Sequence, residues 1–116
     1  MSRTILIVED EADLRNILQD LFAAEGFKVF LAADGSAAYQ TLEKNPVDLI
    51  LADVQMPIMS GLELLKKVRA ERGPDLPVYM MSGGSSFTPD HFMFYGATGY
   101  FEKPLNIADL VESLKK

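Results

Sequence analysis

The amino-acid sequence predicts an α/β fold, a doubly wound five-stranded parallel sheet accompanied by five helices. Two observations support this prediction. Short apolar runs alternate along the whole chain with segments whose apolar residues recur at helical spacing, and the connections between them are short. Because parallel neighbours need a crossover helix, such alternation implies helices on both faces of the sheet. The expected strand order is the flavodoxin-like 2-1-3-4-5.

The first strand is expected at Thr4–Val8, a short β-branched run that stops at three consecutive acidic residues. A helix should follow and end at Gly26, a residue suited to helix ends. Its apolar positions are Leu14, Ile17, Leu18, Leu21 and Phe22. Lys28–Ala32 reads as the second strand, and a shorter helix then runs from Asp34-Gly35-Ser36 through Leu42 to its end at Asn45-Pro46.

The second half of the chain repeats this alternation. Asp48–Ala52 predicts the third strand, and Ser60 with Glu63 offers a capping box for the third helix. Gly73-Pro74 ends that helix before a fourth strand at Pro77–Met81. The remaining elements are a helix near Pro89–Tyr95, a strand at Gly99–Phe101, and a last helix capped by Asn106 with apolar residues Ile107, Leu110, Val111 and Leu114.

Length and composition limit the class of protein. The 116 residues fit one domain spanning 1–116, and the absence of cysteine excludes disulfides, thiolate metal ligands and cysteine nucleophiles. We expect a cytoplasmic protein, because no apolar run is long enough for a membrane span and the start turns acidic too early for a signal peptide. A net charge of −6 argues against direct nucleic-acid binding. We interpret the basic cluster Lys66, Lys67, Arg69 and Arg72 as a solvated helix face.

Polar residues follow the predicted strands. Ligands of open α/β sheets bind at the carboxyl ends of the strands, so Glu9, Asp10 and Asp53 should converge if the first and third strands are neighbours. Oxygen ligands without nearby histidine or cysteine favour Mg²⁺, with Mn²⁺ as the second choice. The alternative is that the acids only favour the start of the first helix, which is our interpretation of Glu11 and Asp13.

Ser82 and Lys103 follow the fourth and fifth strands at the same edge. A lysine is a usual phosphate binder, and a serine hydroxyl can donate to a phosphoryl oxygen. Taken singly, Lys103 could be a surface lysine and Ser82 a turn residue. Together with a metal site and the carboxylate of Asp53, they are the groups that phosphoryl transfer requires.

Four segments carry a resemblance to a known family: ILIVEDE at 5–11, DLILADVQMPIMSGLELL at 48–65, VYMMSGG at 78–84 and GYFEKPL at 99–105. In these segments the chain resembles the receiver domain of two-component response regulators, the group that includes the single-domain chemotaxis regulator. The resemblance covers essentially the whole chain. It implies that Asp53 accepts a phosphoryl group, that Asp10 binds Mg²⁺ directly, and that Glu9 binds it mainly through water.

The resemblance implies further roles. The backbone carbonyl of Gln55 would complete the protein's metal ligands, while Ser82 and Lys103 would contact the phosphoryl group. Tyr100 resembles the aromatic switch residue, coupled to Ser82. The bond before Pro104 resembles the cis peptide of the family, a form that X-Pro bonds adopt at modest cost.

The function expected from these residues is a phosphorylation-dependent signalling switch rather than an enzyme acting on other substrates. Its donor would be a phosphohistidine on a sensor kinase or phosphotransfer protein. Its output surface would be the helix near 89–95, the fifth strand and the last helix, which would contact a downstream effector or a second copy of the chain. The aromatic residues expected to contribute are Phe87, Phe92, Phe94, Tyr95, Tyr100 and Phe101.

Three alternatives stay open. A receiver-like scaffold could act without phosphorylation, although the acidic pocket is complete. A Mg²⁺-dependent aspartyl-phosphate phosphatase usually has a second acid two residues after the nucleophile, where this chain has Gln55. Flavin binding by a flavodoxin-like domain is the most remote alternative.

Overall fold

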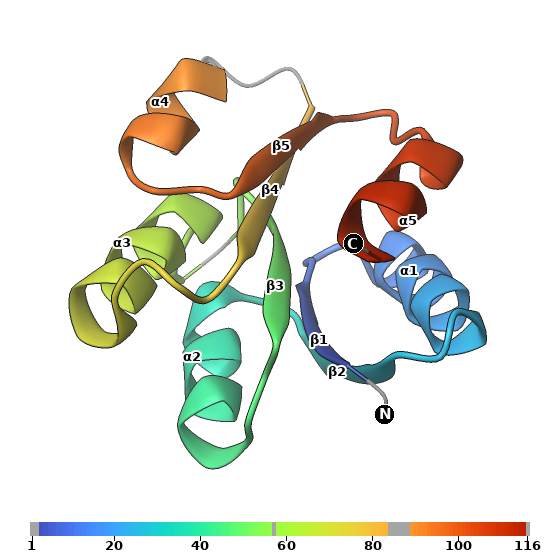
Figure 1. Ribbon diagram of the computed structural model, residues 1–116, viewed down its shortest axis with the longest axis horizontal. Helices are drawn as coiled ribbons and strands as arrows, with labels where there is room; N and C mark the ends of the chain where they lie inside the picture. Colours follow the sequence, from blue (N-terminus) through green and yellow to red (C-terminus); the bar gives the residue numbers. More distant parts are fainter. Residues whose placement is uncertain (1–2, 57, 84–88, 116) are drawn as a thin grey trace.

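The computed structural model describes residues 3–56, 58–83 and 89–115, which form one sheet of five parallel strands in the order β2-β1-β3-β4-β5. The predicted fold class and strand order are therefore confirmed (Figure 1). The strands are β1 Thr4–Val8, β2 Lys28–Ala32, β3 Leu49–Asp53, β4 Val78–Ser82 and β5 Gly99–Glu102. The helices are α1 Ala12–Ala24, α2 Gly35–Lys44, α3 Gly61–Arg72, α4 Pro89–Phe94 and α5 Ile107–Lys115.

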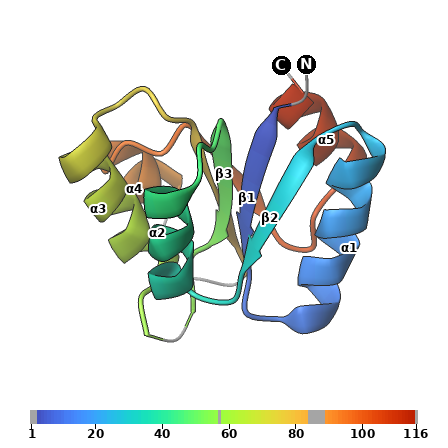
Figure 2. The same ribbon diagram turned by 90° about the horizontal axis from the view of Figure 1, so that it is seen from below.

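Helices cover both faces of the sheet. Figure 2 shows α1 and α5 on one side, with α2, α3 and α4 on the other. Alternate strand residues accordingly enter two apolar clusters: Ile5 and Ile7 pack with α1 and α5, whereas Leu6 and Val8 pack with the helices opposite. β3 is buried along its whole length, as expected for a central parallel strand covered on both faces.

Three strands, β3, β4 and β5, end one residue later than predicted, and in two of them the added residue is a predicted site residue. β3 pairs through Asp53, which lies opposite Met81, and β4 pairs through Ser82, which lies opposite Glu102. Both polar residues are therefore the last residues of their strands rather than the first residues of the following loops. Parallel pairing holds their backbones, so the sheet itself positions the two side chains.

Two helix starts have the predicted caps, α2 has a cap that the sequence analysis did not name, and α1 starts without a side-chain cap. Ser60 and Glu63 form the capping box of α3, the Asp34 side chain accepts from Ala37 N–H at 2.8 Å, and that of Asn106 accepts from Asp109 N–H at 3.1 Å. Glu11 is the first residue before α1, but its side chain makes no capping hydrogen bond within the described chain. Its backbone N–H instead donates to Glu9, so Glu11 contributes only negative charge to the helix start.

The basic face of α3 is more than the solvated surface that we predicted. Arg69 donates to the carbonyls of Gly96 and Gly73, and Arg72 donates to that of Leu42. The ammonium groups of Lys66 and Lys67 lie over the rings of Tyr95 and Tyr39 at 4.3 and 4.6 Å. This face ties α3 to α2 and to the turn after α4. No helix of the described part of the chain is long and apolar enough to cross a membrane.

Candidate functional site

The carboxyl ends of β1, β3, β4 and β5 bring the predicted site residues to one edge of the sheet. Glu9, Asp10 and Asp53 each place a carboxylate oxygen within 4.8 Å of the others. Lys103 extends from the loop after β5 and reaches two of these acids. The adjacency of β1 and β3 causes this convergence, as the expected strand order required.

Glu9 is fully buried, and each of its polar groups has a partner. Its Oε1 accepts from Lys103 Nζ at 2.8 Å, and its Oε2 accepts from Glu11 N–H at 3.1 Å. Its backbone N–H donates to Ala32 O at 3.0 Å, and its carbonyl accepts from Arg15 Nη1 at 2.8 Å. A buried carboxylate is tolerated only with such compensation.

Asp53 is 5% exposed and has longer hydrogen bonds than Glu9. Its Oδ2 lies 3.3 Å from Lys103 Nζ, and its Oδ1 accepts from Gln55 N–H at 3.3 Å. Gly61, the first residue of α3, packs so tightly here that an added Cβ would collide with the Asp53 carbonyl oxygen. Only glycine allows α3 to start against the end of β3, which fixes the backbone of Asp53.

The surroundings of Asp10 and Lys103 shift the pKa of both side chains. Burial raises the pKa of Asp10 above its ordinary value, and the hydrogen bond and negative charge of Glu9 raise it further. For Lys103, burial alone would lower the pKa, but its hydrogen bonds and ion pairs with Glu9 and Asp53 outweigh burial and raise it. Lys103 therefore stays protonated at neutral pH and supplies a fixed positive charge beside Asp53.

Ser82 is 1% exposed, and its Oγ has no hydrogen-bond partner among the described residues. A buried hydroxyl without a partner is unfavourable, so nearly all such groups in folded proteins are paired. Ser82 therefore offers a hydrogen-bond donor for an acceptor that reaches the end of β4. The sequence indicated the hydroxyl but not that it would be unpaired.

The remaining predicted site residues lie around this centre. Tyr100 is half-buried, and its ring stacks on that of Phe92 with centroids 5.3 Å apart. The Lys103–Pro104 peptide bond is cis. Gln55 is exposed in the loop after β3.

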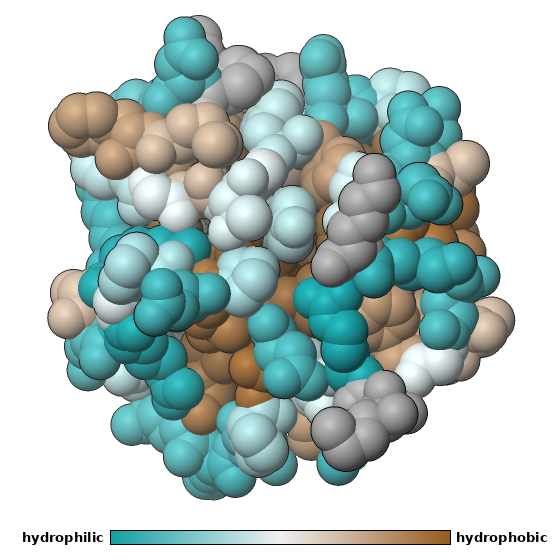
Figure 3. All heavy atoms as spheres, in the orientation of Figure 1, coloured by the Kyte–Doolittle hydropathy of each residue, from teal (hydrophilic) through white to brown (hydrophobic). Residues whose placement is uncertain are grey.

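The aromatic residues of the predicted output surface differ in exposure. Phe92 is fully buried, whereas Phe94 is 80% exposed, which confirms that α4 does not bury all of its rings. Apolar side chains reach the surface over α4 (Figure 3). Phe87, predicted to contribute, lies outside the described residues.

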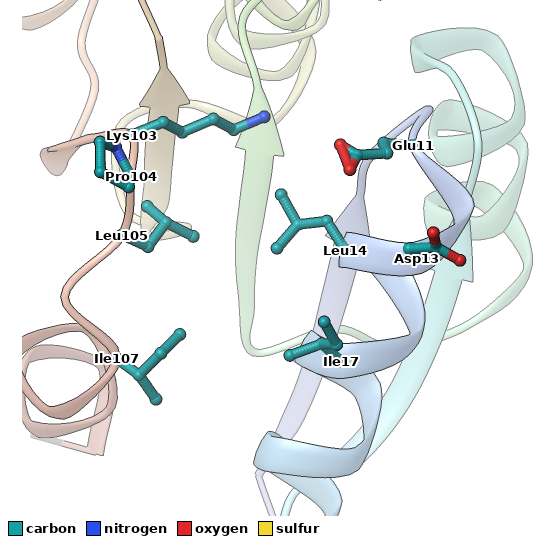
Figure 4. A pocket seen from close by; sticks show the side chains of 8 residues that line it. All are labelled: Glu11, Asp13, Leu14, Ile17, Lys103, Pro104, Leu105 and Ile107. Atoms are coloured by element: carbon teal, nitrogen blue, oxygen red, sulfur yellow. The ribbon is translucent and has the colours of Figure 1, made fainter.

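A groove that the sequence analysis did not predict lies between α1 and the loop before α5 (Figure 4). It has a volume of about 480 Å³ and begins beside Lys103. Ile17 and Ile107, which are 56% and 37% exposed, lie along it. The remaining lining residues are Glu11, Asp13, Leu14, Pro104 and Leu105. Ile17 was predicted only as one of the apolar positions of the first helix, and the periodicity of the sequence could not show that its side chain is exposed.

Known proteins are similar in sequence to this chain over nearly its full length. The chain is 32% identical to sporulation initiation phosphotransferase F of Bacillus subtilis, covering 100% of this chain and 94% of the relative. It is 34% identical to a probable transcriptional regulator, ycf29, of Porphyra purpurea and 37% identical to the transcriptional regulatory protein CpxR of Klebsiella pneumoniae. Those matches cover 99% and 96% of this chain but only 56% and 47% of the relatives, so the chain spans about half of each regulator.

Solved structures agree with these relatives. A putative response regulator from Chloroflexus aurantiacus superposes with a TM-score of 0.92 at 31% identity, covering 99% of this chain and 96% of that one. The chemotaxis response regulator CheY4 of Vibrio cholerae gives 0.88 at 30% identity, with coverage of 99% and 98%. The family model of the response regulator receiver domain matches residues 5–115. The chain therefore belongs to the receiver domain family of two-component response regulators.

Proposed function

We propose that this receiver domain, residues 1–116, is switched by transfer of a phosphoryl group to Asp53. The observation that carries the proposal is that the Asp53 carboxylate lies beside the carboxylates of Glu9 and Asp10 and also contacts the ammonium group of Lys103. The donor would be a phosphohistidine on a sensor kinase or phosphotransfer protein. A downstream effector would read the result.

The donor set fits Mg²⁺. The described part of the chain places three carboxylates together, and hard oxygen ligands favour Mg²⁺ over softer metals, with Mn²⁺ as an alternative. Both oxygens of Glu9 already accept hydrogen bonds, whereas the contacts of Asp53 are longer. Asp10 and Asp53 would therefore bind the ion directly and Glu9 through water, and the family resemblance adds the Gln55 carbonyl as a further ligand. Bound Mg²⁺ supplies positive charge that stabilises the phosphoryl oxygens during transfer.

The residues of the chain have distinct roles in the proposed transfer. An Asp53 carboxylate oxygen attacks phosphorus, forming an O–P bond as the P–N bond to the donor imidazole breaks. The electron pair of the broken bond stays on the imidazole nitrogen. Lys103, 3.3 Å from Asp53 Oδ2, neutralises charge on the phosphoryl oxygens, and the unpaired hydroxyl of Ser82 donates to one of them. The chain thus supplies catalytic groups for its own modification only.

The output proposed for the switch is a change of the surface formed by α4, β5 and α5. A phosphoryl group adds acceptor oxygens that would draw the Ser82 hydroxyl toward Asp53. Tyr100, stacked on Phe92, would then rotate inward beside β4. The exposed Phe94 makes the same region suited to contact with an effector or with a second copy of the chain.

Mass spectrometry tests the phosphoacceptor. Incubation with acetyl phosphate and Mg²⁺ should add one phosphoryl group to the wild-type chain and none to Asp53→Asn. Asp48→Asn, which alters the residue just before β3 at the opposite end of the strand from Asp53, serves as the matched control and should be modified normally. Phosphorylation of Asp53→Asn, or full modification of the wild type in EDTA, would contradict the proposal.

The groove of Figure 4 is the proposed docking position of the donor protein, because it begins at Lys103 and continues along α1. Ile17→Glu places a charge at a position that is 56% exposed, so the fold should tolerate it. Transfer should be measured from the histidine kinase that phosphorylates the wild type fastest. We expect at least a tenfold slower transfer to Ile17→Glu, with Asn16→Glu as control and with unchanged modification by acetyl phosphate. Equal transfer to both variants would contradict docking in the groove.

A further inference from the structure

We infer that Arg15 is a positioning residue for the metal-binding acids, an inference that rests on the metal site of the proposed function. Arg15 lies in α1, and its Nη1 donates to the backbone carbonyl of Glu9 at 2.8 Å. The carbonyl belongs to the peptide group that joins Glu9 to Asp10. The guanidinium of Arg15 therefore holds the peptide from which the exposed Asp10 begins.

The contact matters because the other described hydrogen bonds of Glu9 are made by its N–H and its carboxylate. The N–H of Glu9 is fixed by Ala32 in β2, and its carboxylate is fixed by Lys103 and by the Glu11 N–H. None of these contacts restrains the carbonyl oxygen. Rotation of the peptide would move the Asp10 backbone and with it the carboxylate that would bind Mg²⁺.

Arg15 contacts both the first turn of α1 and the end of β1. Its own N–H donates to the Glu11 carbonyl at 2.9 Å, so its backbone is part of the first turn of α1. Its half-buried side chain turns back to the end of β1. One residue thus links the start of the helix to the end of the strand, and Asp10 lies in the turn between them.

A positioning role and a purely electrostatic role predict opposite signs. A positive charge close to a cation site repels the cation, so removing Arg15 by electrostatics alone would tighten Mg²⁺ binding. Loss of the hydrogen bond would loosen the turn and weaken Mg²⁺ binding, since groups that orient metal ligands commonly contribute tenfold or more to affinity.

The test is a Mg²⁺ titration of the full chain followed by the amide resonances of residues 9–11 and 53. Arg15→Met keeps the length of the side chain but removes its donors. We expect its Mg²⁺ dissociation constant to rise about tenfold, in line with the effect of ligand-orienting groups. Arg15→Lys keeps the charge and one donor group and should recover part of the affinity. Lys28→Met removes the same charge from an exposed position at the start of β2 and should bind as the wild type does.

Thermal unfolding in EDTA shows whether each variant is folded, and titration at temperatures below that transition keeps the comparison valid. If the wild type binds Mg²⁺ and Arg15→Met binds it equally or more tightly, the inference about Arg15 is wrong while the proposed metal site stands. Failure of the wild type to bind Mg²⁺ would instead contradict the metal site of the proposed function, and the inference with it. A parallel loss in Lys28→Met would also overturn the inference, because net charge would then explain the effect.

Discussion

The two halves of the site differ in how fully their polar groups are satisfied. At the ends of β1 and β3, every polar group of Glu9 has a partner, and Asp53 is held by Lys103 and by the Gln55 N–H. At the end of β4, the buried hydroxyl of Ser82 has none among the residues that the structure describes. Beyond it, α4 has only six residues and leaves Phe94 exposed. The side chains at the ends of β1 and β3 are held in place by hydrogen bonds and ion pairs. The Ser82 hydroxyl at the end of β4 remains available to donate a hydrogen bond.

This contrast suggests a division of labour. Preorganised charges accelerate a reaction because they need not reorganise as it proceeds. A switch, in contrast, needs an element whose two arrangements differ little in free energy. The pairing on the β1–β3 side suits the chemistry, and the unpaired hydroxyl with the short helix suits the response.

The largest effect on stability should follow from removing the buried ion pair between Lys103 and Glu9. Lys103→Met leaves the fully buried Glu9 without its cation, and an uncompensated buried charge is strongly destabilising. We expect the free energy of unfolding, measured by urea denaturation at pH 7, to fall by about 3 kcal/mol. Adding Glu9→Gln should restore most of this loss.

Lys115→Met is the matched control, because its ion pair with Glu25 lies at the surface. Surface pairs contribute little, so its effect should stay below about 1 kcal/mol. If Lys103→Met and Lys115→Met lowered the free energy of unfolding equally, the buried ion pair would contribute no more to stability than a surface pair does.

A smaller effect on stability, of opposite sign, should follow from removing the Ser82 hydroxyl at the end of β4. Ser82→Ala removes a buried hydroxyl that has no partner among the described residues. The free energy of unfolding should therefore stay constant or rise by up to about 1 kcal/mol. Thr98→Ala is the control, since its hydroxyl oxygen accepts from the Val78 N–H at 2.9 Å and its loss should destabilise.

The same variant tests the response. Beryllofluoride, a mimic of the phosphoryl group, should shift amide resonances of α4 and β5 in the wild type. In Ser82→Ala these distant shifts should be lost while those near Asp53 persist. Full shifts in α4 without the hydroxyl would contradict a coupling through Ser82.

The smallest effect concerns the pH dependence of Asp10. Its pKa is raised in the folded protein, so the folded state holds this proton more tightly than the unfolded state does. Without metal, stability should therefore fall as the pH rises from the ordinary pKa of the carboxyl group through its raised value. With Mg²⁺ the sign reverses, because the metal binds the ionised carboxylate and its affinity rises over the same pH range.

Melting temperatures of wild type and Asp10→Asn, measured from pH 3.5 to 7 in EDTA and in Mg²⁺, check both signs. In EDTA at neutral pH the asparagine variant should melt at the higher temperature. With Mg²⁺ the wild type should gain stability, and the variant should gain little. A wild type that is the more stable of the two in EDTA at neutral pH would contradict the expected sign.

The sequence by itself determined the order of elements and the residues at the site. Strand and helix periodicities differ, so the alternation of segments could be recognised locally, and the polar residues at the strand ends identified Glu9, Asp10, Asp53, Ser82 and Lys103 as neighbours once strand order was assumed. These inferences needed only the positions of residues within elements. The family resemblance supplied the roles that we propose for each of them.

Only the tertiary structure decided which partners these residues have. The ion pair of Lys103 with Glu9 joins residues distant in sequence, and the hydrogen bond of Arg15 to the Glu9 carbonyl depends on how α1 packs against the end of β1. The lack of a partner for the Ser82 hydroxyl among the described residues likewise depends on packing. The same holds for Arg69, predicted as part of a solvated face but bonded to Gly96. Periodicity reports which face of an element is buried, whereas a hydrogen bond requires atoms placed within a few tenths of an ångström, and that precision arises only when the elements pack together.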